Sequence, residues 1–372
     1  MEDLIFSITE DIKDIPKKDW DRLFGSGIIE GYGYHKVIQD AKLKEFCIYY
    51  LLAKKNGLIR AIVPFFTEEF SFTTIIQGPL QKLIFSIRKL FKNFLKMNIL
   101  FVGLPTAEEL YIGISPELNL KSLLQELSRF SKLKKISLIL FYNLTAKHKL
   151  LSESLQKDKF SKMENFPNTI IEINAASLDG YIEGLGSNTR KDLKKKLRKT
   201  GYPESFTIET RNDISGIEDS VYGLYRNNFT DSDVHFEELS PYFFQNICRE
   251  MPGVARYFIF RKAGKIVAFN LCLVNNDTCI DKFIGFDKEL SHQYHLYQVT
   301  FCHNIDWCIK NKIKYYQMGI TDYHPKIRLG ARLVNLDNYI KLSNPFFNLF
   351  LKPVARILEP KNFDPTLKKI ST

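Results

Sequence analysis

Two apolar segments on either side of Lys262-Ala263-Gly264-Lys265 constrain the fold of this chain more than any other feature. Each segment, 255–261 and 265–274, has the length of a strand, and the glycine between charged residues is typical of a tight turn. The pattern predicts an antiparallel hairpin, with Cys279–Gly285 as a third strand beside it. Such a sheet must be covered by helices or by a second sheet to bury its apolar faces.

Helices and strands alternate around this hairpin. Helical spacing predicts helices at 188–200, 217–228, 239–250 and 292–311, the first of them ending at Gly201. Short apolar runs predict further strands at 169–173, 206–210, 314–318 and 336–342. The second half of the chain is therefore expected to be an α+β (α/β) domain, with a mixed, largely antiparallel sheet flanked by helices.

The first half follows a similar plan. A hairpin is expected at 46–66 around the turn Lys54-Lys55-Asn56-Gly57. Further strands are expected at 4–8, 99–102, 110–114 and 135–141, and helices at 16–24, 80–95 and 118–130. We interpret this as two copies of one fold. The charged stretch 158–167 suggests a boundary, which gives domains at 1–164 and 165–345 and a tail at 346–372.

Length and composition are those of a globular protein. The 372 residues are enough for two domains, and 45% of them are hydrophobic. No apolar run approaches the roughly 18–20 residues that cross a bilayer, and Met1-Glu2-Asp3-Leu4 lacks the basic start of a signal peptide. The default expectation is a cytoplasmic location. The six cysteines form no CxxC pair, so we interpret them as small buried hydrophobic residues.

A net charge of +11 favours an anionic partner such as a nucleotide cofactor, a tRNA or a membrane surface, although lysine-rich usage throughout the chain is an alternative explanation. Seven of the ten residues in 190–199 are basic. Arg190 and Lys191 stand at the expected helix start, where a cation opposes the helix dipole unless an anion is bound. This helix either binds phosphate or presents its basic side chains to solvent.

Three stretches carry a family resemblance: 181–201, 282–287 leading into the helix 292–311, and 315–319 followed by 326–331. Together they resemble the GNAT-related acyltransferases that include the FemAB/FemX peptidyltransferases and the BioF2-like acetyltransferase domain. The resemblance implies tandem GNAT-like domains, the first of them degenerate. It also implies an acyl donor and an amine acceptor, but it leaves the donor open between acyl-CoA, such as acetyl-CoA, and aminoacyl-tRNA.

The resemblance implies donor-binding residues at two helix starts: Asn188, Arg190 and Lys191 on the first, and Ser291 and His292 on the second. Ordinary GNAT enzymes hold the CoA pyrophosphate with a loop of the form Arg/Gln-x-x-Gly-x-Gly/Ala and the helix that follows it. The corresponding stretch 290–297 has no glycine. Ser291 is expected to cap the helix and leave its amides available.

Acyl transfer to an amine needs a base, a stabilised carbonyl oxygen and a proton for the leaving group. Asp281 and Asp322 are the candidate bases, and Tyr297 is the candidate acid. Substrate-binding candidates are Tyr225, Lys282, Tyr323, Lys326 and Arg328. For each of these an ordinary role in packing, in a surface loop or on the solvent face of a strand is the alternative. His292 and His295 are too few for a metal site, and none is expected.

The leading hypothesis is an N-acyltransferase that uses acyl-CoA to modify an amine of a small molecule or cell-envelope precursor. The alternatives are an aminoacyl-tRNA-dependent, FemX-like peptidyltransferase in peptidoglycan synthesis and a non-catalytic binding module. The basic amphipathic segment 81–96 and the aromatic tail 344–358 also suggest peripheral contact with the inner membrane surface, although such stripes often pack on a core.

Overall fold

The computed structural model describes residues 4–25, 27–44, 46–71, 96–231 and 238–371. The chain divides into two compact units. Unit 1 comprises Met1–Ser26, Lys42–Asn165 and Asn335–Ser371, and unit 2 comprises Gly27–Ala41 and Phe166–Val334. Each unit is therefore assembled from segments that are distant in the sequence. The continuous domains 1–164 and 165–345 expected above, with a tail at 346–372, stay a prediction.

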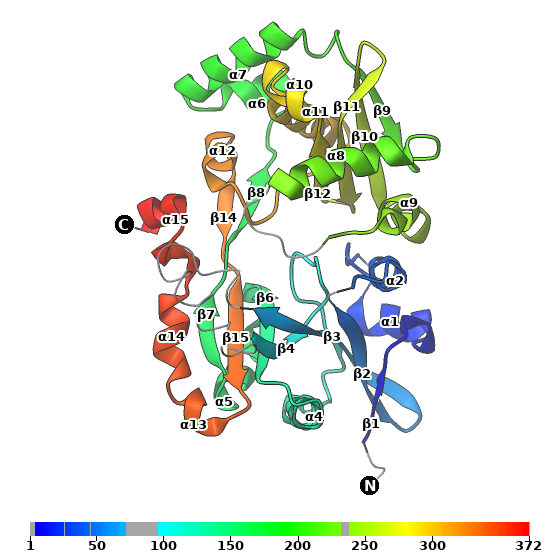
Figure 1. The fold of residues 1–372 in the computed structure, drawn as a ribbon, viewed down its shortest axis with the longest axis vertical. Coiled ribbons are helices and arrows are strands. Elements are labelled where there is room, and N and C mark those ends of the chain that lie inside the picture. Colours follow the sequence, from blue (N-terminus) through cyan, green and yellow to red (C-terminus); the bar gives the residue numbers. More distant parts are fainter. Residues whose placement is uncertain (1–3, 26, 45, 72–95, 232–237, 372) are drawn as a thin grey trace, which may run out of the picture. The chain divides into compact units, whose positions relative to one another are not determined.

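Unit 1 is built on one mixed sheet in the order β1-β2-β3-β4-β6-β15-β7, with β5 beside β3 (Figure 1). Among the described strands of this sheet, only β4 and β6 pair in parallel. The strands are β1 (Ile5–Thr9), β2 (Cys47–Lys55), β3 (Leu58–Ser71), β4 (Lys96–Val102), β5 (Gly113–Ile114), β6 (Leu138–Leu144), β7 (Ser161–Glu164) and β15 (Asp337–Leu342).

Helices cover both faces of this sheet. One face packs on α4 (Leu120–Leu133) and α5 (Lys149–Lys157), whose leucines join the main core cluster. The other face carries a smaller cluster in which Leu351 and Ala355 of α14 (Leu351–Ile357) lie against strand residues. Within the described residues of unit 1, the other helices are α1 (Lys17–Phe24), α13 (Pro345–Asn348) and α15 (Pro365–Ser371).

Unit 2 has a second mixed sheet in the order β14-β8-β13-β12-β11-β10-β9. Its strands are β8 (Asn168–Glu172), β9 (Thr207–Arg211), β10 (Ala255–Lys262), β11 (Lys265–Val274), β12 (Thr278–Phe286), β13 (Tyr315–Gln317) and β14 (Arg332–Val334). Within the described part of this sheet, β12 and β13 form the parallel pair. The expected hairpin is confirmed: Lys262 pairs with Lys265, and Ala263 and Gly264 take the positive φ angles, 47° and 81°, of a two-residue turn.

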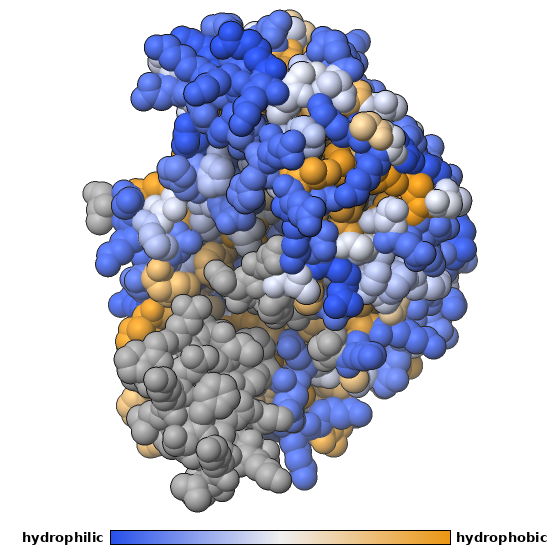
Figure 2. Space-filling model, turned by 45° about the horizontal axis from the view of Figure 1, so that its top comes forward, coloured by the Kyte–Doolittle hydropathy of each residue, from blue (hydrophilic) through white to orange (hydrophobic). Residues whose placement is uncertain are grey.

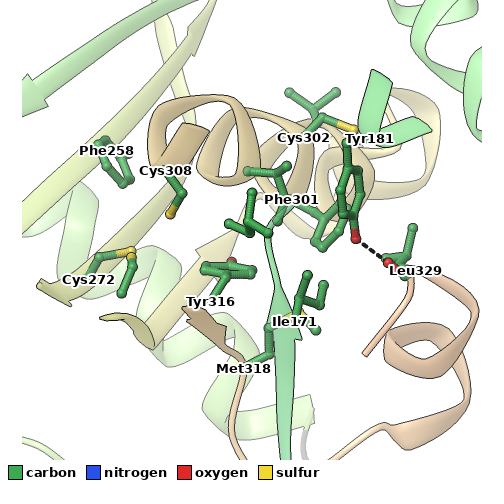
Figure 3. Packing of buried hydrophobic residues seen from close by; sticks show 14 of the residues in the cluster. Ile171, Tyr181, Phe258, Cys272, Phe301, Cys302, Cys308, Tyr316, Met318 and Leu329 are labelled. Atoms are coloured by element: carbon green, nitrogen blue, oxygen red, sulfur yellow. Dashed lines mark hydrogen bonds between the residues drawn. The ribbon is translucent and has the colours of Figure 1, made fainter. Parts of the chain in front are cut away.

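The helices of unit 2 are α2 (Tyr32–Asp40), α6 (Leu178–Glu183), α7 (Ser187–Thr200), α8 (Glu218–Asp231), α9 (Pro241–Glu250), α10 (Lys288–Gln293), α11 (Leu296–Lys310) and α12 (Tyr323–Arg328). Apolar side chains of α6, α7 and α11 form the core on one face of the sheet, as Figure 3 shows for Tyr181, Phe301 and Cys308. Helix α8 packs on β12. It comes so close at Gly285 that a Cβ there would lie 2.7 Å from the Leu224 carbonyl carbon, which explains a glycine within the strand.

The two sheets share one plan. Four antiparallel strands, β1 to β4 or β9 to β12, are followed by one parallel strand, β6 or β13, and then by an antiparallel strand, β15 or β8. The expectation of an α+β protein with two related, largely antiparallel sheets is therefore confirmed.

Three details differ from expectation. The strand at 336–342 belongs to the unit 1 sheet, because Tyr339 and Ile340 bury their side chains in that unit's clusters. The helix at 292–311 is broken into α10 and α11, because His295 has a φ of 45° and cannot continue a right-handed helix. Only the last two residues of the strand at 110–114 form a strand, β5. The helix expected at 80–95, and most of the segment 81–96, lie outside the described residues.

In the described ranges, no helix is both long enough and apolar enough to span a bilayer.

Candidate active site in unit 2

Strand β13 ends part-way along its neighbour β12. They pair from Thr278 and Tyr315 to Ile280 and Gln317, where β13 ends, whereas β12 continues beside β11 to Phe286. The β11–β12 register shifts at this point, because Cys272 lies opposite Asp281 while Leu271 lies opposite Phe283. Lys282 is thus the extra residue of a β-bulge. Bulges of this kind often lie beside active sites, where they redirect side chains and free backbone groups.

Asp281 is the carboxylate at this point. It is partly buried, and it accepts hydrogen bonds from Asn270 Nδ2 at 2.8 Å and from the Tyr316 hydroxyl at 2.6 Å. Burial raises its pKa to about 6, against the opposing effect of these two hydrogen bonds and of the Lys326 charge. A carboxylate that titrates close to neutral pH and keeps some exposure has the properties of a general base.

A buried polar chain continues behind Asp281. The Tyr316 hydroxyl on β13 accepts a hydrogen bond of 2.9 Å from Asn304 Nδ2 on α11, and both side chains are buried. Figure 3 shows Tyr316 below this helix, near Phe301. Asn270 and Asn304 are fully buried, and their Oδ1 atoms have no hydrogen-bond partner among the described residues. Buried acceptors of this kind are uncommon in proteins and call for a functional explanation.

Three further sequence-predicted residues lie in the same neighbourhood. Burial raises the pKa of Tyr297, and the negative charges of Asp281 and Asp322 add to this effect. Asp322 is exposed at the start of α12 with a φ of 51°. Lys326 is buried and donates to the Met318 carbonyl, just past the end of β13. Tyr297 is thus within electrostatic range of Asp281 and Asp322, and Asp281 is within range of Lys326.

A basic cluster lies at the beginning of α11. Helix α7 packs on α11, and the surface over α7, at the upper left of Figure 2, is hydrophilic. Burial lowers the pKa of His295, and the positive charges of Lys196 and Lys199 lower it further. The first turn of α11 also presents backbone N–H groups and the positive end of a helix dipole. These features together favour the binding of an anion at this end of α11.

The predicted donor-binding residues are placed differently from expectation. Arg190 donates to the Glu183 carbonyl at 2.8 Å and lies 3.4 Å from its carboxylate, so a protein anion already balances the cation at the start of α7. Asn188 and Lys191 are exposed on the same turn. Ser291 lies inside α10, whose cap is Asp287, so its expected capping role is wrong. His292 is exposed in the last turn of α10.

Three predicted substrate-binding residues are occupied by structural contacts. Lys282 forms an ion pair of 2.6 Å with Glu30, and both side chains are almost fully buried. The Tyr225 hydroxyl accepts from the Leu239 N–H, and the Tyr323 hydroxyl donates to the Pro167 carbonyl. All three side chains lie inside the protein, and their contact with a ligand stays a prediction. Arg328 is exposed and lies 3.6 Å from Asp192 of α7.

Several residues of the site were not predicted from the sequence. No sequence motif marks Glu30 in its N-terminal segment, Tyr316 in its short strand or Asn304 inside its helix. Lys196 and Lys199 lie within the basic helix that the sequence does mark. The sequence could have indicated Lys196, because a helical wheel drawn through Leu193 and Leu197 places it beside the buried stripe.

Unit 2 also has a hollow outside this cluster. A shallow hollow of about 310 Å³ lies between α8 and β11, and its lining includes Asn227, Lys265 and Asp287 but none of the residues around Asp281. Among the residues that the structure describes, no group of three or more His, Cys, Asp or Glu side chains is placed to hold a metal ion.

Comparisons with known proteins match this geometry. The family model of the acetyltransferase (GNAT) domain matches residues 187–326, all of which lie in unit 2. Residues 187–326 of unit 2 thus resemble a GNAT-type acetyltransferase domain. The resemblance to GNAT-related acyltransferases that the sequence suggested is thereby confirmed, and the matched residues include the end of β13, the basic helix α7 and Lys326.

One curated relative comes from Mycobacterium tuberculosis and bears the name "Putative 8-amino-7-oxononanoate synthase 2". It is 22% identical over 320 residues, which cover 82% of this chain and 41% of the relative. The chain thus spans less than half the length of that protein.

Two solved structures share the fold over almost the whole chain. FemX aligns with a TM-score of 0.58 and 10% identity, covering 92% of this chain and 99% of FemX. A tandem GNAT protein from the clavulanic acid biosynthesis pathway aligns with a TM-score of 0.53 and 8% identity, covering 92% and 99%. At these identities the likeness concerns the fold, and it supports the tandem GNAT-like arrangement.

Proposed function

We propose that this protein is an N-acyltransferase in which Asp281 is the general base and an amine is the acceptor. The observation that carries this proposal is the position of Asp281, a desolvated yet partly exposed carboxylate at the point where β13 ends beside β12. A carboxylate with a pKa of about 6 is largely ionised at neutral pH, but it binds a proton more readily than an ordinary aspartate. It can therefore take a proton from an attacking ammonium or amine.

The reaction requires one bond to form and one to break. The amine nitrogen attacks the acyl carbonyl carbon, the bond to the leaving group breaks, and Asp281 accepts the proton released by the nitrogen. In this proposal a backbone N–H at the Lys282 bulge stabilises the developing oxyanion. Tyr297 lies in the first turn of α11, beside the proposed donor end, and its raised pKa keeps it protonated, so it is the proposed proton source for the leaving group.

We propose acyl-CoA as the donor. The beginning of α11 offers backbone N–H groups, and Lys196 and Lys199 add positive charge next to it. His295 adopts the left-handed conformation that glycines support in ordinary phosphate loops, so the backbone turns without a glycine. Phosphates of CoA and of a tRNA terminus share this chemistry. An aminoacyl-tRNA donor is thus the second candidate, and the fold shared with FemX and the basic α7 favour it.

Donor identity can be tested by thermal shift with acetyl-CoA, a longer acyl-CoA and a charged tRNA, each at several concentrations. We expect CoA esters to raise the unfolding temperature and charged tRNA to leave it unchanged. Stabilisation by charged tRNA alone would overturn the CoA assignment and support the FemX-like alternative. Release of free CoA thiol in the presence of amino sugars, amino acids or polyamines then identifies the acceptor class. If no donor stabilises the protein and no thiol is released, the N-acyltransferase proposal fails in favour of a binding module.

A further inference from the structure

A second feature of the molecule lies in unit 1, on helices α13 and α14. Six apolar side chains on these helices and the link between them point into solvent, with exposed fractions of 63, 58, 75, 57, 47 and 70%. We call this set the α13–α14 face; it consists of Phe346, Phe347, Leu349, Phe350, Val354 and Ile357. Single exposed apolar residues are ordinary on a protein surface, but a contiguous cluster with three phenylalanines marks an interaction site.

The segment that carries this face is fixed to the fold. Leu351 and Ala355 are buried in the cluster on the outer side of the unit 1 sheet. The Asn344 side chain caps α13 by accepting from the Phe346 N–H, and Asn348 accepts from the Leu342 N–H while donating to the Lys159 carbonyl. Because one side of the segment is anchored in this way, the apolar residues on the other side are held outward.

A basic segment lies next to this face. The Ser343 N–H donates to the Ser137 carbonyl, and its hydroxyl donates to the Ile136 carbonyl. These bonds hold the beginning of α13 beside the end of α4 and the turn that follows it, and Leu133, the last residue of α4, is 73% exposed. Three lysines of this segment, Lys132, Lys134 and Lys135, are exposed as well.

The charged side chains of the two segments 131–137 and 343–358 have a single sign. Lys352 and Arg356 are exposed on α14, which makes five cations together with the three lysines of the basic segment. Neither 131–137 nor 343–358 contains an aspartate or a glutamate. Two copies of this surface would repel each other, whereas an acidic lipid surface would attract it. Exposed aromatic and aliphatic side chains ringed by lysine and arginine are typical of helices that lie in the interface of a bilayer.

We propose that the α13–α14 face and the adjoining segment 132–135 form a docking surface for membranes that contain anionic phospholipid. The phenylalanines enter the boundary between headgroups and acyl chains, and the five cations lie among the headgroup phosphates. This inference does not depend on the proposed acyl transfer, since none of its residues belongs to unit 2.

The test is co-sedimentation of the full chain with vesicles of phosphatidylcholine alone and of phosphatidylcholine mixed with phosphatidylglycerol. We expect binding to the mixed vesicles, weakened by added salt, and little binding to phosphatidylcholine alone. The triple variant Phe346→Ser, Phe347→Ser, Phe350→Ser should lose roughly tenfold or more in partitioning, since three apolar anchors are removed. The matched control, Ile5→Ser with Leu58→Ser, removes equally exposed apolar residues elsewhere in unit 1 and should bind as the wild type does.

A second variant keeps the proposal testable if the triple variant does not fold. Lys352→Glu with Arg356→Glu changes only exposed charges, and it should weaken binding to the mixed vesicles and reduce its salt dependence. Wild-type protein that stays in solution with both kinds of vesicle would overturn the proposal. So would a dimer in sedimentation velocity that the phenylalanine variant dissociates, because the face would then be covered by a second copy.

Discussion

The Tyr316 hydroxyl on β13 donates a hydrogen bond of 2.6 Å to the Asp281 carboxylate on the neighbouring strand β12. Tyr316 is itself fixed by Asn304, so the donor has one orientation. A hydrogen bond to a carboxylate favours its charged form, whereas burial favours its neutral form. The pKa of about 6 reflects the balance, with burial as the larger effect.

If Asp281 is the base, Asp281→Asn should lower kcat/KM for amine acylation by about a hundredfold or more while the fold is kept. For the wild type, kcat/KM should rise with pH through about 6, because the base is active when it is ionised. The acid limb should be missing from the residual activity of the variant. A pH–rate profile of both proteins checks this, and an unchanged acid limb in the variant would assign the titration to another group.

Tyr316→Phe should shift the acid limb of the pH–rate profile to higher pH. The variant removes a donor to the charged carboxylate, and hydrogen bonds to charged groups contribute about 1.5–3 kcal/mol, or roughly one to two pH units. Activity at high pH should change much less than activity near pH 6. A variant that lowers the rate equally at every pH would show that Tyr316 only supports the packing.

The raised pKa also predicts how stability depends on pH. In the unfolded chain an aspartate titrates near 3.8, so between there and about 6 the folded state binds more protons than the unfolded state. The contribution of Asp281 to the free energy of unfolding is therefore greatest below the pKa of the unfolded chain, and it falls as the pH rises to about 6. The asparagine of Asp281→Asn does not titrate. The free energy of unfolding of the variant should therefore increase relative to that of the wild type as the pH rises across this window, by about 3 kcal/mol at most. Urea titrations at several pH values measure the difference; a constant difference across the window would contradict the assignment.

How far the sequence predicts this fold depends on the range of the contacts. The hairpin at Lys262 to Lys265 is specified by local turn chemistry and by two apolar runs, and it was predicted correctly. The strand at 336–342 was predicted as a strand but was assigned to the second half. Its periodicity is equally compatible with either sheet, and its partner β6 lies nearly two hundred positions away.

The site shows the same limit. Asp281 was a candidate base because it lies inside a strand, but alternation could not tell a buried base from a solvent-facing residue. The β-bulge that follows it is a property of the register with β11 and leaves no local signature. Lys282 was taken for a substrate contact because its partner Glu30 lies in a segment that the sequence places in the other half.

The Glu30–Lys282 ion pair predicts a strong coupling in stability. Lys282→Met leaves a buried carboxylate without its counter-ion, which should cost about 3–5 kcal/mol, and Glu30→Gln should also destabilise the protein. The double variant should lose much less than the sum of the two single variants. Chemical denaturation of all four proteins gives the coupling energy; additive losses would mean that the two charges do not depend on each other.

The last prediction separates the two ends of α7. Lys196 and Lys199 act on His295 at the beginning of α11, where Lys196 also pairs with Asp192 at 2.9 Å, and Arg190 is paired with Glu183 at the other end of α7. Lys196→Ala with Lys199→Ala should therefore raise the KM for the donor and reduce its salt dependence, with little change in kcat, because the lost contacts are made equally in the ground state and the transition state.

A matched variant, Lys191→Ala with Lys195→Ala, removes the same charge from exposed positions of the same helix and should leave the donor KM close to that of the wild type. Steady-state kinetics at two salt concentrations compare the pairs. Equal effects of the two variants would show that α7 acts through its overall charge. A larger effect of Arg190→Ala with Lys191→Ala would instead place the donor at the beginning of α7, where the sequence alone had suggested it.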